Sequence, residues 1–281
     1  MASKHKKPSE IISALKRNVY LIARGRKVAT EGKEAIKWQT IGTGFLAGPN
    51  KFVTCSHVID DKKQKNEIAH HQDGDLYFFV KHDDENQIHI HVAPYFVMGQ
   101  NIFLYPDIDL AILILDDNFY EKDGHRYKNK SEFIHVSQSF HLIGEEVGVL
   151  GYPLCELQFQ NQDFYKPLLG KILLRTDAGV INCRYQSSPK KYMYEFTIAF
   201  NPGNSGGPIF DLHTGKLISI VTGYKSFVIQ TIETPITPNM RTGIPIQKYS
   251  GESFVDVIRT NYSYGTATPS FAEAFQTHKI S

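Results

Sequence analysis

The sequence predicts an all-β protein built from two antiparallel β-barrels, with short helices near its two ends. Short β-prone runs recur along the whole chain, and turns containing Gly or Pro separate them. No alternation of strands with long amphipathic helices is present. At 281 residues and 41% hydrophobic content, the chain can bury a substantial core, as one large or two small domains. Many short strands in a chain of this size favour paired barrels.

The first half is predicted to contain one short helix followed by strands. Pro8 and Ser9 are start signals for an amphipathic helix over residues 9–17. Residues 25–37 are polar and contain glycine, which predicts a loop. Strands are expected at 19–23, 40–46, 52–55, 76–80, 87–92, 95–98 and 110–115.

The second half has the same texture, with strands expected at 146–150, 171–174, 179–183, 194–198, 208–210, 217–222 and 244–246. A polar, charged segment at 116–132 is the expected junction. Residues 253–262 have a helical apolar pattern, and a further short helix is expected at 271–276. The predicted layout is an N-terminal helix and tail (1–17), a first barrel (18–120), a second barrel (121–250) and a C-terminal helix and tail (251–281).

The most informative segment is Asn-Pro-Gly-Asn-Ser-Gly-Gly-Pro at 201–208. Its glycines allow a tight turn with dihedral angles that side chains forbid. Such a turn can direct the amides of Gly203 and Ser205 into one space beside the Ser205 hydroxyl. Acyl transfer needs this combination of a nucleophile and paired N–H donors for the developing oxyanion. A serine alone in a Gly-rich turn is usually only a turn residue.

A serine nucleophile needs a base and an acid that orients the base, and both types occur upstream. His57 ends an apolar, β-prone run, and Asp109 precedes a strongly hydrophobic strand. Asp107 is a competing acid, because a shift of two residues keeps the same strand face. The chain order is His, Asp, Ser, which separates this arrangement from the other folds that converged on the same triad.

These motifs resemble those of chymotrypsin-fold serine proteases, most of all the HtrA/Deg-type core. Thr-x-x-His is matched by 54–57, Asp-Leu-Ala by 109–111, and the serine motif of the HtrA/Deg group by 201–208. Weaker echoes lie at 42–45 and 149–153, and the likeness covers roughly residues 18–250. The resemblance implies two six-stranded barrels, an active site between them, and a C-terminal helix packed on the second barrel. The chain leaves too few residues after the second barrel for a PDZ domain.

The resemblance also implies roles for individual residues. His57, Asp109 and Ser205 would be the catalytic triad, and the turn of Gly203, Asn204 and Ser205 would form the oxyanion hole. No metal or organic cofactor is required. Because Asn204 replaces the aspartate that pairs with a new N-terminus in digestive relatives, we expect no activation by N-terminal cleavage.

Specificity is partly predictable from the register of the family. Residues 222–224 (Thr-Gly-Tyr) would be the edge strand that receives the substrate backbone, and Gly243 would leave the pocket wall open. Ala199 stands where trypsin has its acid, with Phe200 beside it. A cationic side chain would lack a partner there, so we expect a small or medium apolar residue at the substrate position before the cleaved bond (P1).

Two other classes of function stay open. The fold could serve as a catalytically silent or partner-activated module that binds peptides. The same machinery could also act as an esterase or acyltransferase, although the chain order argues against an α/β-hydrolase. We expect a protein or peptide substrate and leave open a regulatory partner or a larger complex.

Composition limits the kinds of partner and the cellular compartment that we expect for this protein. With 31 basic and 29 acidic residues, net charge is +2, which gives no reason to expect a nucleic-acid partner. No apolar run approaches a membrane span, and polar residues interrupt any leader peptide, so we expect no membrane partner and a cytoplasmic protein. Three cysteines suit a reducing compartment, with Cys55 interpreted as a small buried residue. His89 and His91 could bind zinc, but a solvated polar strand is the simpler interpretation.

Overall fold

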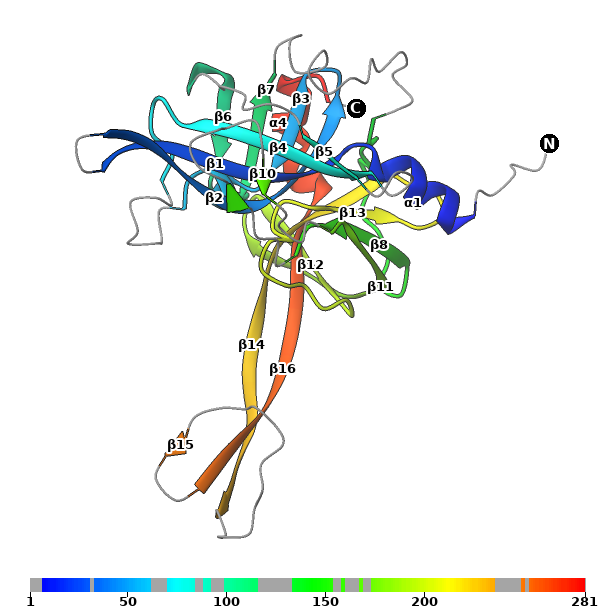
Figure 1. The fold of residues 1–281 in the computed structure, drawn as a ribbon. Helices are drawn as coiled ribbons and strands as arrows, with labels where there is room; N and C mark the ends of the chain where they lie inside the picture. Colours follow the sequence, from blue (N-terminus) through cyan, green and yellow to red (C-terminus); the bar gives the residue numbers. More distant parts are fainter. Residues whose placement is uncertain are drawn as a thin grey trace, which may run out of the picture.

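The protein is described by a computed structural model that covers residues 7–30, 33–61, 70–83, 88–91, 99–115, 133–153, 158–159, 167–168, 173–235, 249–250 and 253–280. Strands dominate these residues and gather into two large antiparallel sheets (Figure 1). The prediction of an all-β, chymotrypsin-like fold with short helices is confirmed.

The first half forms a seven-stranded sheet in the order β5-β4-β1-β2-β3-β7-β6. Its strands cover every predicted strand of this half that lies in the described residues. Their bounds are β1 (Val19–Thr30), β2 (Lys33–Gly48), β3 (Lys51–Thr54), β4 (Leu76–Asp83), β5 (Ile88–His91), β6 (Ile102–Tyr105) and β7 (Leu110–Ile114). Two short helices connect them, α2 (Ser56–Ile59) after β3 and η2 (Gly99–Asn101) before β6.

The second half closes into a six-stranded barrel. Strand order is β12-β11-β8-β13-β14-β16-β15, and an additional β12–β16 pairing joins the first strand to the sixth. A separate two-stranded ladder is formed by β9 and β10. The bounds are β8 (Glu146–Gly151), β9 (Gln158–Phe159), β10 (Pro167–Leu168), β11 (Arg175–Ser188), β12 (Lys191–Phe196), β13 (Pro208–Asp211), β14 (Leu217–Pro235), β15 (Tyr249–Ser250) and β16 (Ser253–Ala267).

Two apolar cores correspond to the two halves, and the larger one reaches across their boundary. Aromatic rings fill the first core, with Phe52 and Phe79 in edge contact at 4.7 Å between centroids. Tyr152, from the end of β8, is fully buried in this same core. The second barrel has its own core, which includes Val149, Tyr194 and Ile209. Shared apolar burial therefore holds the halves together where the functional residues meet.

The C-terminal part of the chain corrects one expectation. Residues 253–262 were predicted to be a helix, but they belong to strand β16. Backbone pairing with β14 along the whole of β16 overrides a weak helical pattern. The real helices follow later, as η4 (Thr268–Phe271) and α4 (Ala272–Thr277), close to the second predicted position.

The terminal helices contact both halves of the molecule. At the N-terminus, α1 (Pro8–Lys16) buries Ile11 and Leu15 in the larger core. At the C-terminus, Phe271 and Phe275 enter the same core. His278 packs on β6, where its Nε2 lies 2.9 Å from the Tyr105 hydroxyl. The C-terminal helices also contact the second barrel, where the Ser270 hydroxyl accepts the Tyr192 amide of β12 at 2.8 Å and the Glu273 carboxylate lies 3.6 Å from Lys190 Nζ.

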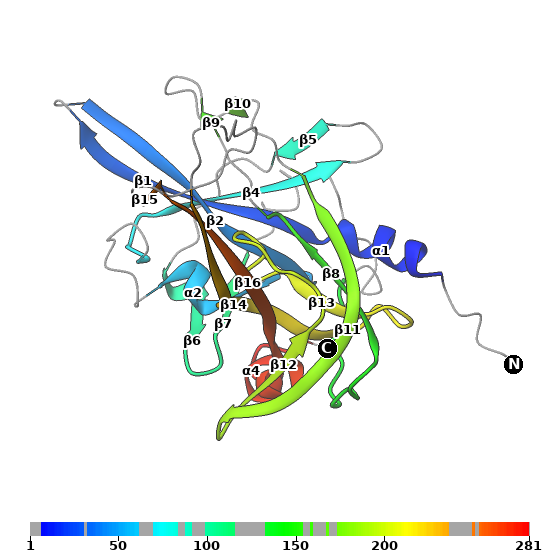
Figure 2. The ribbon, with the colours of Figure 1, turned by 90° about the horizontal axis from the view of Figure 1, so that it is seen from below.

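Two hairpins continue beyond the sheets that contain their bases. β1 and β2 pair from Val19↔Phe45 to Thr30↔Lys33, so the loop predicted at 25–37 is wrong. β14 and β16 leave the second barrel together and project from the body (Figure 1). Figure 2 shows both hairpins from a second direction. No helix in the described part of the chain is both long enough and apolar enough to span a membrane.

Candidate active site

His57 lies on α2, the single helical turn that follows β3. Cys55 precedes this turn in an extended conformation, and the Val58 amide donates to the Cys55 carbonyl oxygen. Val58 and Ile59 are buried, which fixes the turn against the first core. The His57 side chain keeps 33% of its surface exposed. A buried turn therefore presents a reachable imidazole.

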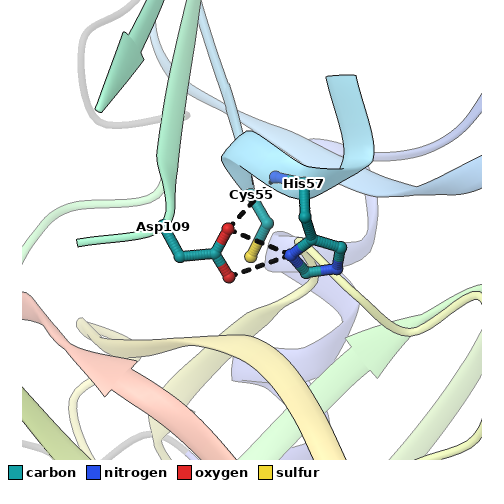
Figure 3. A group of neighbouring side chains, drawn as sticks. All are labelled: Cys55, His57 and Asp109. Atoms are coloured by element: carbon teal, nitrogen blue, oxygen red, sulfur yellow. Dashed lines mark hydrogen bonds and ion pairs between the residues drawn. The ribbon is translucent and has the colours of Figure 1, made fainter. Parts of the chain in front are cut away.

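Asp109 holds the imidazole from the next strand of the sheet. Its two carboxylate oxygens lie 3.0 and 2.9 Å from His57 Nδ1, and Oδ1 also accepts the His57 backbone N–H at 3.1 Å (Figure 3). Asp109 has a left-handed backbone, with φ of 56°, directly before β7. Asp and Asn tolerate this conformation better than most residues. The exposed Asp107, the alternative acid, lies two residues away.

Cys55 packs beside the His57–Asp109 pair on the buried side of the site. Its side chain is fully buried, and its thiol donates to the Val221 carbonyl oxygen at 3.2 Å. Figure 3 shows the sulfur beside the Asp109 carboxylate and the imidazole. Burial, reinforced by the charge of Asp109, raises the pKa of the Cys55 thiol well above its usual range. Cys55 is therefore a protonated packing residue, as interpreted from the sequence.

Two successive turns shape the segment around Ser205. The Asn204 amide donates to the Asn201 carbonyl oxygen, and the Gly207 amide donates to the Asn204 carbonyl oxygen. The third residue of each turn is a glycine with positive φ, 96° at Gly203 and 84° at Gly206. A type II turn requires this conformation at that position. Among the described residues, the amides of Gly203 and Ser205 donate no hydrogen bond.

Thr43 joins the two halves at this point, a role that the sequence did not reveal. From β2 its amide donates to the Ser205 carbonyl oxygen at 2.9 Å, and its hydroxyl donates to the Gly203 carbonyl oxygen at 2.7 Å. The same hydroxyl accepts the Tyr152 amide at 3.0 Å. The only sequence signal was its place between two glycines. A side chain at Gly42 would crowd the serine turn, because a Cβ there would lie 2.9 Å from the Ser205 carbonyl oxygen.

The three predicted triad residues are not all joined by hydrogen bonds among the described residues. His57 and Asp109 are bonded directly, whereas the Ser205 hydroxyl makes no hydrogen bond to either of them in this part of the chain. The Ser205 segment still belongs to the same site. The Gly206 amide donates to the carbonyl oxygen of Val221, which also accepts the Cys55 thiol.

The predicted specificity residues have different surroundings. Thr222, Gly223 and Tyr224 follow directly after Val221 on β14, and Tyr224 is 40% exposed. Ala199 is exposed, whereas Phe200 is buried in the core of the second barrel, 6.0 Å from Phe196 between ring centroids. Gly243 and the strand predicted at 244–246 lie outside the described residues.

Tyr264 is a second residue that the sequence did not reveal. It pairs with Gly223 across β14 and β16, and a Cβ added at Gly223 would lie 3.0 Å from the Tyr264 hydroxyl. Burial raises the pKa of Tyr264, and the charge of Asp109 adds to this effect. The tyrosine therefore lies against the edge strand and close enough to the buried acid to sense its charge. Because residues 253–262 resembled a helix, the strand pairing that brings it there was not foreseen.

The donors at this site suit proton transfer better than metal binding. Donor atoms of Cys55, His57 and Asp109 lie within 4.8 Å of one another. A thiol with a raised pKa resists forming the thiolate that binds metals. His57 Nδ1 is already engaged by Asp109. A second group, His141, Glu145 and Asp211, is partly exposed, and Glu145 engages His141 Nδ1 at 2.6 Å.

The two-sheet fold and the His–Asp pair between the halves define a trypsin-like protein. A family model described as a trypsin-like peptidase domain matches residues 42–220, which is more than half of the chain. The chain therefore belongs to the trypsin-like peptidase family. This span contains His57, Asp109 and Ser205.

Solved structures confirm the fold. One is the HtrA-type protease AlgW with a decapeptide, with a TM-score of 0.54 and 14% identity over 97% of this chain and 67% of that chain. A second is a variant of AlgW with a decapeptide, with a TM-score of 0.54 and 13% identity over 97% of this chain and 66% of that chain. The chain thus spans about two thirds of the length of these proteins. No curated protein matches by sequence.

Proposed function

We propose that this chain is a serine endopeptidase that cleaves peptide bonds through an acyl-enzyme on Ser205. The observation that carries the proposal is the hydrogen bonding of His57 by Asp109, whose two carboxylate oxygens lie within 3.0 Å of Nδ1. This contact fixes the tautomer with a proton on Nδ1 and leaves Nε2 as the base. An endopeptidase substrate also agrees with the solved relatives, which are proteases with a bound decapeptide.

The reaction would proceed in two steps. His57 Nε2 takes the Ser205 proton as the hydroxyl oxygen bonds to the substrate carbonyl carbon, and the proton then passes to the leaving amine as the C–N bond breaks. Water next attacks the acyl-enzyme, again with His57 as the base, and releases the acid product and free Ser205. Asp109 stabilises the imidazolium in both steps.

The oxyanion would be bound by the amides of Gly203 and Ser205. Both amides are without an acceptor among the described residues, whereas the Asn204 amide is used within its own turn. Asn204 would therefore contribute by shaping the turn. A donor of this kind contributes about 10²–10³ in kcat. Because Ser205 and His57 are not yet hydrogen-bonded, bound substrate would draw the two halves of the site together, as in other resting enzymes.

We also propose that activity does not depend on N-terminal cleavage. The Asn204 side chain is buried beside Gly151, where a Cβ would lie 2.5 Å from Asn204 Oδ1, and it carries no charge to pair with a new amino group. Residues Ile11 and Leu15 already belong to the larger core. Removal of residues 1–17 should therefore destabilise the protein and never activate it. A rise in kcat/KM after this truncation would contradict the proposal.

A small or medium apolar P1 residue is proposed because no acid stands at Ala199 and Tyr264 lies against Gly223. Digestion of unfolded casein, with the cleavage sites read by mass spectrometry, tests this preference. We expect cleavage after Val, Leu or Ala to exceed cleavage after Arg or Lys. The reverse order would reject the proposed pocket.

A second candidate function is a silent or partner-activated peptide-binding module. It is favoured because, among the described residues, His57 is hydrogen-bonded to Asp109 and not to the Ser205 hydroxyl. A fluorophosphonate probe separates the two candidates, because it bonds only to an activated serine. We expect labelling of the wild type and none of Ser205→Ala or His57→Ala. Unlabelled wild type that still binds peptide would favour the second candidate.

A cytoplasmic location is proposed from the cysteines. Cys55 and Cys183 are both free thiols, as is usual in a reducing compartment. Fractionation of the producing cells checks this, and recovery of the mature chain outside the cytoplasm would contradict it.

A further inference from the structure

β14 and β16 form a two-stranded arm that has no counterpart in the predicted barrel. We define the arm as residues 225–235 of β14 and 253–262 of β16. Its backbone pairing is continuous from Lys225↔Tyr262 to Pro235↔Ser253, with one irregularity between Val228 and Gln230. Figure 1 shows the two strands leaving the body side by side, and they remain adjacent in the second view of Figure 2.

Among the described strands, one edge of β14 has no partner along the arm. β13 pairs with β14 only up to Pro208↔Ile220, and Val221 exchanges backbone hydrogen bonds with Gly206 and Gly207. From Thr222 to Pro235, no strand in the described part of the chain pairs with this edge. At about 3.4 Å per residue, the open edge is roughly 45 Å long.

We propose that this edge binds the substrate segment N-terminal to the cleaved bond as an added antiparallel strand. The proposal rests on the proposed protease function and extends the docking site from residues 222–224 along the arm. Direction follows from geometry, because the edge begins at Val221, which is bonded to the Ser205 turn. A peptide that runs antiparallel to β14 points its C-terminal end toward Ser205 and its N-terminal end toward Pro235.

The opposite edge of the arm cannot serve in this way. β16 is occupied by β12 at residues 263–266, where the arm meets the barrel. A peptide on that edge would run into β12, whereas a peptide on the β14 edge runs into the serine turn. A third strand also answers a physical need, because an isolated two-stranded ribbon is marginally stable in water.

The chemistry of this edge defines the substrate class. An open strand edge offers alternating backbone N–H and C=O groups, so it recognises backbone in extended conformation and reads little side-chain identity. Suitable substrates are unfolded proteins or long strand-forming peptides with no proline in the paired segment. Peptides that extend only a few residues N-terminal to the cleaved bond would be poor substrates.

The first experiment measures dependence on length with the full chain. The probes are fluorescent peptides with Val at P1 and alternating Thr and Val residues extending four, eight or twelve residues N-terminally. Binding to Ser205→Ala is measured by anisotropy, and cleavage by the wild type is measured as kcat/KM. We expect at least tenfold tighter binding and at least tenfold higher kcat/KM from four to twelve residues. Values that do not change with length overturn the proposal.

This design separates the two proposals. Failure of the wild type to cleave any peptide, while length-dependent binding persists, rejects the protease function and keeps the arm as a peptide-binding edge. Cleavage that is independent of length keeps the protease and rejects the arm. Arms that protect each other from hydrogen exchange in a dimer, without a gain from long peptides, would assign the edge to a second copy of the chain.

Backbone methylation gives a sharper test of the pairing. Single N-methyl groups are placed at successive positions of the twelve-residue peptide, from the fifth to the tenth before the cleaved bond. Only alternate amides of a strand face its partner, so we expect severalfold losses at every second position. Equal losses at all positions, or none, would exclude strand addition.

A shortened chain supplies the matched protein control. Residues 226–261 are replaced by Asn-Gly, which is a favourable two-residue hairpin turn between the paired Lys225 and Tyr262. Because this replacement also removes Gly243 of the predicted pocket, the readout is the ratio of kcat/KM for the twelve-residue peptide to that for the four-residue peptide. We expect the tenfold advantage of the twelve-residue peptide to be lost. A retained advantage would overturn the proposal, and the methylation series on the full chain decides the matter if the shortened chain does not fold.

Discussion

The acid–base half of the candidate site and its nucleophile half are held in different ways. His57 is fixed by three contacts with one carboxylate and by a fully buried thiol behind it. Among the described residues, the hydrogen bonds that fix Ser205 come from its backbone, through two glycine turns and Thr43. The acid–base half is therefore complete at rest, whereas the nucleophile half supplies a shaped backbone whose side chain is not yet engaged.

The largest expected effect on kcat comes from replacing Asp109, the acid of the acid–base half. Asn at position 109 tolerates the left-handed backbone and can still accept the His57 N–H, but its NH₂ group would face Nδ1 and favour the wrong tautomer. We expect kcat to fall about 10⁴-fold for Asp109→Asn, with little change in the free energy of unfolding. Peptide hydrolysis and urea unfolding measure the two quantities.

The control for this prediction is Asp107→Asn, which changes the exposed neighbour in the same turn. Its kcat should stay within about twofold of the wild type. An Asp109→Asn enzyme that loses less than tenfold, or an Asp107→Asn enzyme that loses as much, would remove Asp109 from the proposed triad.

A smaller effect is expected from cutting the link to the nucleophile half. Thr43→Val keeps the shape of the side chain but leaves the Gly203 carbonyl and the Tyr152 amide without their partner. Each orphaned buried group costs about 1–3 kcal/mol. We therefore expect a loss of about 2–4 kcal/mol in the free energy of unfolding and a fall of about 10–100-fold in kcat, with KM nearly unchanged.

Ser219→Ala is the matched control, because the buried Ser219 hydroxyl donates one hydrogen bond, to the Thr266 carbonyl oxygen at 2.9 Å, within the second barrel. Its cost should be about 1 kcal/mol, with kcat close to that of the wild type. Equal losses of kcat in the two variants would show that Thr43 acts on stability alone.

The same contrast explains what the sequence could and could not predict. The turns at 201–208 were predictable because glycine at the third turn position and proline at the second are local requirements of the backbone. His57 and Asp109 were recognisable because each borders a buried strand, β3 or β7, whose apolar run is visible in the sequence. Local chemistry therefore predicted the parts of the site.

The connections between these parts were not predictable. Thr43 acts through bonds to residues more than one hundred positions away, such as Gly203 and Tyr152. Tyr264 reaches the edge strand only because residues 253–267 pair with β14. The β1–β2 hairpin at 25–37 and the strand at 253–262 are held by backbone pairing beyond the rest of their sheets. Side-chain periodicity carries little information there.

The cysteines can show whether the acid–base half stays closed in solution. Cys55 is fully buried and its pKa is raised, whereas Cys183 on β11 is half-buried. Because alkylation requires an accessible thiolate, we expect iodoacetamide at pH 8 to modify Cys183 at least about 100-fold faster than Cys55. Peptide mapping by mass spectrometry measures each site separately. Comparable rates would mean that the acid–base half opens at rest, contrary to the comparison.

The smallest expected effect is on the pH dependence of the free energy of unfolding. It arises from two partly buried histidines that pack on the first half. Burial lowers the pKa of His71, whose Nδ1 lies 2.8 Å from the Tyr77 hydroxyl, and of His278, which follows α4 and packs on β6. In the unfolded chain a histidine has a pKa of about 6.5. Below that pH the unfolded state binds more protons, so the stabilisation is present above about 6.5 and is lost as the pH falls.

Both side chains remain partly exposed, so each should contribute less than about 1 kcal/mol between pH 7.5 and 5. Urea unfolding across this range should give a flatter profile for the His71→Gln, His278→Gln double variant than for the wild type. His213→Gln, on the exposed surface of the second half, is the control and should follow the wild type. Amides of β4 and β6 should also lose protection from hydrogen exchange in acid before those of β8. Simultaneous loss in all three strands would mean that the halves unfold as one unit, and that the contrast between them is confined to the site itself.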